Sequence, residues 1–192
     1  MFHMKQFPVE TLKLLNSYIK ILMKWNKKIN LTSYSKEELL EVGVFDAFVL
    51  KEVLNILGVK EILDVGTGYG MPGMIIKILD PSINVSLLDG SEKKIAFLEY
   101  VSKILHIPMT IYFKHLPDKS WNKRFDCIVS KASMQEKALI DITHKLLNLN
   151  GKLIYFSSRE PINNVYLPVC GAIFYKRKIG DSFLIIRKKA EE

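Results

Sequence analysis

The chain has 192 residues, 48% of them hydrophobic, so we expect it to bury one well-filled core as a single domain. Lysine and arginine number 28 against 20 aspartates and glutamates, and this net charge of +8 favours a polyanionic partner such as nucleic acid. The first residues lack the apolar core of a secretory signal, and no apolar run approaches the roughly 18 residues that cross a bilayer. We therefore expect a cytoplasmic protein with no membrane partner.

Two helices are predicted in residues 1–58, which we interpret as an N-terminal helical extension. Residues 8–28 carry apolar side chains at helical spacing with lysines between them, which indicates an amphipathic helix with a basic end. Ser35 precedes two glutamates, a pattern that starts helices because the hydroxyl caps free N–H groups and acids suit the positive helix end. We expect this second helix to reach about Leu57, with a place for an interruption at Gly43.

In residues 59–192 the pattern changes to short apolar runs that alternate with helices. The runs EILDVG, NVSLLD, MTIYF, FDCIVS and GKLIYF are predicted as buried strands, and helices are predicted to begin near Pro72, Ser91 and Gln135. This alternation implies a parallel sheet with helices on both faces.

A glycine-rich segment, DVGTGYGMPG, follows the first predicted strand and runs from Asp64 to Gly73. Read from Gly68 it is the dinucleotide pattern G-x-G-x-x-G; read from Asp64 it is D-x-G-x-G-x-G, the loop that holds S-adenosylmethionine in many methyltransferases. Glycine lets a backbone turn sharply and lie against a ligand, here where open α/β sheets bind theirs. The candidate cofactor-binding residues of the loop are Asp64, Gly66, Thr67, Gly68, Gly70 and Gly73.

Two aspartates near this loop each have alternative roles. Asp89 ends the second predicted strand, where a carboxylate can accept hydrogen bonds from both ribose hydroxyls of a nucleoside; the alternative is a cap for the following helix. Asp64 either fixes the loop or contacts the sulfonium side of the cofactor through water.

The end of the chain separates the two cofactor patterns. GAIFYKRKI and DSFLIIRKK read as strands separated only by Gly180 and Asp181, which suits a tight hairpin. A mostly parallel sheet that ends in an antiparallel hairpin is typical of Rossmann-like methyltransferases, whereas a nicotinamide-binding domain continues with another βα half. We predict the α/β fold of a class I S-adenosylmethionine-dependent methyltransferase. Cys127 and Cys170 have no neighbouring cysteine or histidine pair, so neither a disulfide nor a zinc site is expected.

Three stretches of the sequence indicate a family. They are WNKKINLT at residues 25–32, the DVGTGYGMPG loop, and LLDGSEKKIAFL, which begins in the second predicted strand. The first matches the pattern W-N-x-x-x-N-L-T. With them the chain resembles the bacterial small-subunit ribosomal RNA guanine-N7 methyltransferases, also called the glucose-inhibited-division B family. The resemblance implies S-adenosylmethionine as methyl donor and guanine N7 in 16S rRNA near the decoding region as acceptor, with rRNA or the small subunit as partner. We expect the protein to be a monomer. Guanine N7 has a lone pair and no proton, so its attack requires alignment more than a general base.

The chain departs from the family pattern mainly on the substrate side. Gly43 replaces a histidine, Lys131 replaces the arginine of S-R-A after the fourth strand, and residues 157–158 are Ser-Ser in place of Lys-Gly. Residues 116–118, Leu-Pro-Asp, stand for the Arg-Ala-Glu that flanks the adenine, which makes Asp118 an adenine-side candidate. Lys131 keeps the charge and is our candidate for an RNA or base contact.

The RNA side rests on clusters of basic residues and leaves alternatives open. A non-catalytic RNA-binding or ribosome-assembly factor, or a methyltransferase with another acceptor, would keep the same fold. Trp25 is expected to anchor the core in preference to stacking on a base. The basic clusters are Lys24, Lys27 and Lys28; Lys123 and Arg124; Lys176, Arg177 and Lys178; and Arg187, Lys188 and Lys189.

Overall fold

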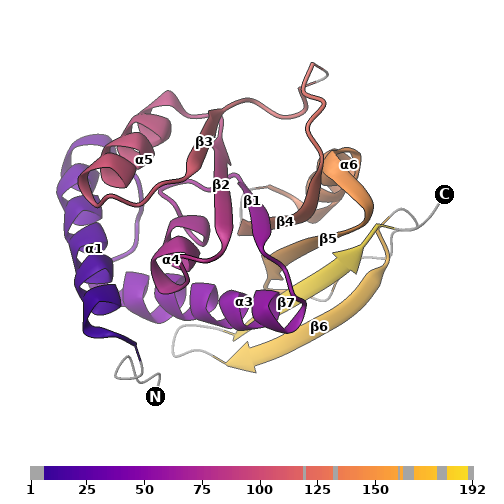
Figure 1. Ribbon diagram of the computed structural model, residues 1–192, viewed down its shortest axis with the longest axis horizontal. Helices are drawn as coiled ribbons and strands as arrows, with labels where there is room; N and C mark the ends of the chain where they lie inside the picture. The colour runs from indigo at the N-terminus through magenta and orange to yellow at the C-terminus, as the bar shows by residue number, and fades with distance from the viewer. Residues whose placement is uncertain are drawn as a thin grey trace.

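A seven-stranded sheet in the order β3-β2-β1-β4-β5-β7-β6 forms the centre of the protein (Figure 1). The computed structural model describes residues 7–118, 120–131, 134–159, 161, 167–176 and 181–189. The strands are β1 (Glu61–Val65), β2 (Asn84–Asp89), β3 (Thr110–Phe113), β4 (Phe125–Lys131), β5 (Leu147–Ser157), β6 (Val169–Lys176) and β7 (Asp181–Lys188).

The helices begin where the sequence predicts them. Pro72, Ser91 and Gln135 are the residues that immediately precede the three helices between strands. In the described residues no helix combines the length and apolar character that a membrane crossing needs. The helical segments are α1 (Val9–Ile29), α2 (Lys36–Glu38), the π-helix η2 (Leu39–Val44), α3 (Phe45–Ile56), α4 (Gly73–Leu79), α5 (Glu92–Ile104) and α6 (Glu136–Leu146).

Strand pairing confirms the predicted fold class. β1 pairs in parallel with β2 and β4, β2 with β3, and β4 with β5, whereas β7 pairs antiparallel with both β5 and β6. One strand boundary of the prediction is wrong: β5 begins at Leu147, ahead of Gly151, because Leu147 pairs with Phe125 before a register shift. Asp181 pairs with Lys176 and begins β7, as the run DSFLIIRKK predicts, so it is not a turn residue. Gly180 lies outside the described residues.

The two faces of the sheet bury different helices. Side chains of one strand alternate between faces, so Ile62 joins a core with α1, α3, α4 and α5, while Leu63 joins a second core with α6. In Figure 1, α1 and α5 lie at the β3 end, and the β6–β7 hairpin lies at the opposite end. The N-terminal helices therefore share a hydrophobic core with the sheet.

The predicted interruption of the second helix is a π-helical turn. Ser35 and Glu38 form a reciprocal capping box at its start, and η2 contains Gly43. A Cβ atom at Gly43 would overlap the sulfur of Met71, so this methionine of the glycine-rich loop fills the space that a side chain at residue 43 would occupy. This turn therefore packs against the glycine-rich loop.

The WNKKINLT segment ends α1 and fixes the following chain. The Asn26 amide nitrogen donates to the Thr32 carbonyl, and the Thr32 N–H donates to the Asn26 side-chain oxygen, both at 2.8 Å. Trp25 packs against Phe97 and Tyr100 with ring centroids 5.5 and 5.2 Å apart. The prediction that Trp25 anchors the core is confirmed, and the motif is a structural clamp.

Asn26→Ala is expected to lower the free energy of unfolding by about 1–3 kcal/mol, because it leaves two part-buried backbone groups without their partners. Urea unfolding measures the change. The control is Asn55→Ala, an exposed residue of α3, which should change stability by less than about 0.5 kcal/mol. Equal effects of the two substitutions would contradict the clamp.

Candidate active site

A cleft of about 430 Å³ lies at the carboxyl ends of β1, β2 and β4. This is the edge where open α/β sheets bind ligands. Met71 and Leu31 add apolar surface to it. Of the predicted site residues, Gly66, Thr67, Gly68, Asp89 and Lys131 line the cleft; Asp64, Gly70, Gly73 and Asp118 are not among its described lining residues.

The glycine-rich loop has the backbone that its composition predicts. Gly66, Gly68 and Gly70 have φ values of 69°, 62° and 99°, in the region that side chains disfavour. The N–H groups of Gly66 and Thr67 donate to the Leu88 carbonyl at 2.9 and 3.0 Å, which holds the loop against β2. The backbone of residues 66–68 consequently faces the cleft.

Asp64 lies behind the loop and is fully buried. Its Oδ2 accepts hydrogen bonds from the Thr67 hydroxyl at 2.7 Å and the Gly73 N–H at 2.8 Å. Its Oδ1 is buried without a hydrogen-bond partner in the described structure. Burial raises the pKa of Asp64 to about 7, although the bonds from Thr67 and Gly73 oppose the shift. These are the contacts of a residue that fixes the loop.

Asp89 lies at the end of β2, where its carboxylate bonds the glycine-rich loop and the residue before α5. Its Oδ2 accepts from the Gly68 N–H at 2.8 Å, and its Oδ1 accepts from the Ser91 N–H at 2.9 Å at the start of α5. The Lys94 ammonium lies 3.6 Å away. A carboxylate has about four acceptor positions, so these bonds leave room for ligand hydroxyls on the cleft side.

The other two candidates, Lys131 and Asp118, are held in ion pairs. Lys131 Nζ lies 2.8 Å from Asp46 Oδ2, and its side chain is 13% exposed. Asp118 bonds Lys114 at 2.7 Å, and this bond, with those from Ser120, lowers the pKa of Asp118 to about 2. Asp118 therefore reaches the cleft only through Lys114, which lines it.

A second cavity of about 790 Å³ adjoins the cleft. Tyr34, Lys131 and Met134 line both. The departures at Ser157 and Ser158 also line the second cavity, which places them on the side away from the glycine-rich loop. A nucleotide-sized ligand fits a space of this volume, since ligand pockets commonly measure about 300–1,000 Å³.

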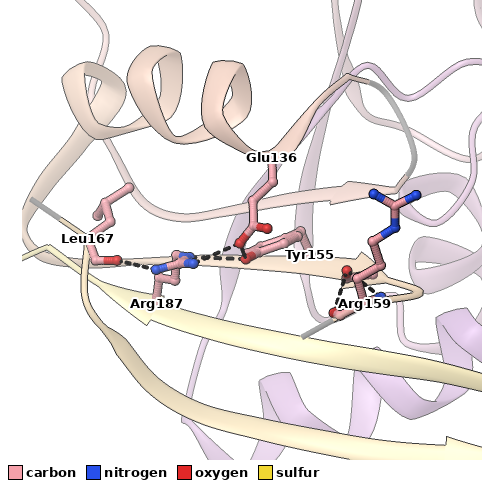
Figure 2. A network of polar contacts seen from close by, with 6 residues as sticks. Glu136, Tyr155, Arg159, Leu167 and Arg187 are labelled. Atoms are coloured by element: carbon pink, nitrogen blue, oxygen red, sulfur yellow. Dashed lines mark hydrogen bonds and ion pairs between the residues drawn. The ribbon is translucent and has the colours of Figure 1, made fainter. Parts of the chain in front are cut away.

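A buried polar network forms part of this second cavity (Figure 2). The Arg187 guanidinium is fully buried and donates to Glu136 at 2.7 Å, to the Tyr155 hydroxyl at 3.0 Å and to the Leu167 carbonyl at 2.7 Å. The Tyr155 hydroxyl donates to Glu136 as well. Assigning Arg187 to a phosphate-binding surface was wrong, because the fold buries it. Arg159, which is also labelled in Figure 2, lines the second cavity and is exposed.

Comparison with protein families supplies the decisive observation. A model of the family described as rRNA small subunit methyltransferase G matches residues 11–165. The chain belongs to this family. Membership confirms the predicted enzyme class, an S-adenosylmethionine-dependent rRNA methyltransferase.

Relatives within the rRNA small subunit methyltransferase G family align over most of the chain. The Streptococcus pyogenes (strain MGAS9429) protein named ribosomal RNA small subunit methyltransferase G is 29% identical over 92% of this chain and 82% of its own length. The Mesoplasma florum protein of the same name is 35% identical over 73% of this chain and 60% of its own.

Solved structures confirm the fold. An O-methyltransferase from Bacillus cereus in complex with SAH has a TM-score of 0.67 and 17% identity over 90% of this chain and 91% of that chain. Magnesium protoporphyrin IX methyltransferase from Synechocystis PCC 6803 with bound SAM has a TM-score of 0.63 and 11% identity over 95% and 99% of the two chains.

The cleft residues fit the methyl donor of this family. At Gly70 an added Cβ would lie 2.8 Å from the Met74 Cβ, so the loop keeps its open shape only with glycine there. Asp89 presents carboxylate oxygens, and residues 66–68 present backbone, to one cleft. Such groups suit hydroxyls and an amino-acid moiety, and no phosphate-binding lysine of the Walker type is present in the loop.

The pKa of Asp64 predicts a pH-dependent stability. Between its ordinary pKa near 3.8 and the folded value of about 7, the folded protein binds a proton that the unfolded chain releases. Relative to Asp64→Asn, the native protein should therefore lose stability as pH rises from about 4 to 7, by at most about 4 kcal/mol, and no further above 7. Urea unfolding at a series of pH values tests this, with the exposed Asp126→Asn as control. Parallel profiles for native protein and Asp64→Asn would show that Asp64 titrates normally.

Proposed function

We propose that this protein transfers the methyl group of S-adenosylmethionine to N7 of a guanine in 16S ribosomal RNA. The family assigns methylation of small-subunit rRNA. The proposal adds the acceptor atom and the residues that bind donor and acceptor. The donor supplies an electrophilic methyl group on a sulfonium centre.

The carboxylates that line the second cavity support N7 as the acceptor atom. Among its described lining residues these are Asp46 and Glu136. Asp46 is paired with Lys131 at 2.8 Å, and Glu136 with Arg187 at 2.7 Å. Both carboxylates are already held by these partners, so the cavity suits an acceptor atom that reacts through a lone pair and gives up no proton. Guanine N7 has such a lone pair, whereas an exocyclic amine must also lose a proton.

The donor side of the proposal divides the predicted residues by their contacts. Residues 66–68 and Asp89 contact the cofactor, with the Asp89 carboxylate accepting from the ribose hydroxyls. Asp64, Gly70 and Gly73 hold the loop in shape. Asp118 acts through Lys114 on the adenine side, which is a smaller role than direct contact.

The acceptor side relies on positive charge outside the cavities. Lys24, Lys27 and Lys28 of α1 are exposed and can bind phosphates independently of sequence. We propose that the protein acts as a monomer. Its proposed compartment is the cytoplasm, where bacterial ribosomal RNA is found.

Asp89→Asn is expected to raise the Kd for S-adenosylmethionine by about tenfold or more, because a charged acceptor of ribose hydroxyls is replaced by a neutral amide. Isothermal titration calorimetry measures it. Asp80→Asn is a matched control. Asp80 Oδ1 accepts a hydrogen bond from the N–H of the residue two positions later, Ser82, as Asp89 does from Ser91. Asp80 follows α4 and is not among the described residues that line the cleft. Similar affinities for both variants would remove Asp89 from the donor site.

Methyl transfer to small ribosomal subunits tests the reaction itself. Subunits from a strain lacking this protein are incubated with it and labelled S-adenosylmethionine, and the modified base is identified after digestion. Label in N7-methylguanine is the expected outcome. Label in another base would overturn the acceptor assignment, and intact cofactor binding without any transfer would favour a non-catalytic binding factor.

A further inference from the structure

Lys131 lies where the donor cleft and the second cavity meet. It lines both spaces, and Tyr34 and Met134 are the other described residues that do so. Its side chain is only 13% exposed. An ammonium group at this junction is therefore close both to a ligand of the glycine-rich loop and to a ligand of the second cavity.

Three elements of the fold fix the position of this ammonium. Asp46, fully buried in the first turn of α3, places Oδ2 2.8 Å from Lys131 Nζ. The Tyr175 hydroxyl of β6 donates to Asp46 Oδ1 at 2.7 Å, so both carboxylate oxygens are engaged. The Phe156 ring of β5 lies 5.7 Å from Nζ. Lys131 is thus aimed by the fold, whereas an exposed lysine would move freely.

A buried ion pair of this kind adds little to stability. Removing two charges from water is costly, and an apolar pair of similar volume is often as stable. The arrangement does, however, orient the Lys131 side chain at the edge of two cavities. The ion pair therefore matters mainly for the ligand that the Lys131 ammonium contacts there.

Guanine and adenine differ at the atom beside N7. Guanine presents N7 and O6, both acceptors, whereas adenine presents N7 and an amino group that donates. An ammonium group only donates. A fixed ammonium beside the methyl-accepting N7 therefore favours the O6 of guanine and repels the amino group of adenine.

We propose that Lys131 donates a hydrogen bond to O6 of the acceptor guanine in the second cavity, and that Asp46 is the positioning residue that aims it. The inference rests on the proposed function and adds how guanine is distinguished from adenine. The Lys131 contact with the Val42 carbonyl, at 3.3 Å, is long for a hydrogen bond and can be exchanged for the base oxygen.

Nucleotide binding tests the inference without relying on turnover. Guanosine and adenosine monophosphate are titrated by NMR into the full chain, with saturating S-adenosylhomocysteine to fill the donor cleft. The native protein should bind the guanosine nucleotide about tenfold more tightly, the worth of one charged hydrogen bond. Lys131→Met and Asp46→Asn should bring the ratio of the two affinities close to one, and Lys131→Arg should retain the preference.

Glu52→Gln is the matched control. Like Asp46, Glu52 is a carboxylate of α3 that pairs with a lysine, here Lys51 at 2.6 Å. Neither Glu52 nor Lys51 is among the described residues that line the two cavities. The nucleotide preference of this variant should equal that of the native protein. Thermal unfolding checks that each variant is folded. Equal affinity of the native protein for both nucleotides, including no binding of either, overturns the inference, as does a preference that persists in Lys131→Met.

Methyl transfer to small subunits separates this inference from the proposed function. If the native protein forms N7-methylguanine while Lys131→Met keeps native nucleotide preference and kcat, the inference is wrong and the function stands. If the Lys131-dependent preference is present but no N7-methylguanine forms, the proposed function is wrong and the base specificity stands. A loss of kcat in Asp46→Asn with little change in KM for subunits supports positioning.

Discussion

Asp64 lies at the end of β1 with its carboxyl group fully buried, and one of its oxygens accepts hydrogen bonds from both Thr67 and Gly73. These two bonds join the start of the glycine-rich loop to the start of α4. A Cβ at Gly73 would lie 2.8 Å from the same oxygen. The Asp64 carboxyl group can therefore occupy this position only because residue 73 has no side chain. It sets the loop that then reaches Asp89 through the Gly68 N–H.

Burying the Asp64 carboxyl group has a cost in stability, because its charged form loses contact with water. Desolvation outweighs the two hydrogen bonds, and the pKa of Asp64 rises to about 7. A fully solvated aspartate would avoid that cost but could not hold two backbone segments this close. The loop shape is therefore maintained at some expense in stability, as is common where a backbone must approach a ligand.

A second set of contacts joins the N-terminal helices to the sheet at the edge of the cleft. Met71 of the loop occupies the space beside Gly43, and Asp46 of the next turn pairs with Lys131 of β4. Gly43 and Lys131, two positions where we expect the chain to differ from the family pattern, thus lie on either side of the same junction. Met71 fills the space beside Gly43 and Asp46 pairs with Lys131, so both residues fit the surrounding packing.

Local sequence patterns predict most of the helices and strands and the glycine-rich loop. Helix starts at Pro72, Ser91 and Gln135, and the turn at Gly43, follow from caps, prolines and glycines that act over a few residues. Short apolar runs likewise predicted the strands, although the start of β5 depended on its pairing with β4.

Which charged groups are buried, and which groups they pair with, depends on tertiary packing. The sequence predicts an RNA or base contact for Lys131 and a basic surface cluster for Arg187. The fold pairs Lys131 with Asp46 and encloses Arg187 with Glu136 and Tyr155. Local sequence carries the backbone preferences of a segment. The partner of a buried charge comes from a distant segment that packing brings into contact, so no local pattern records it.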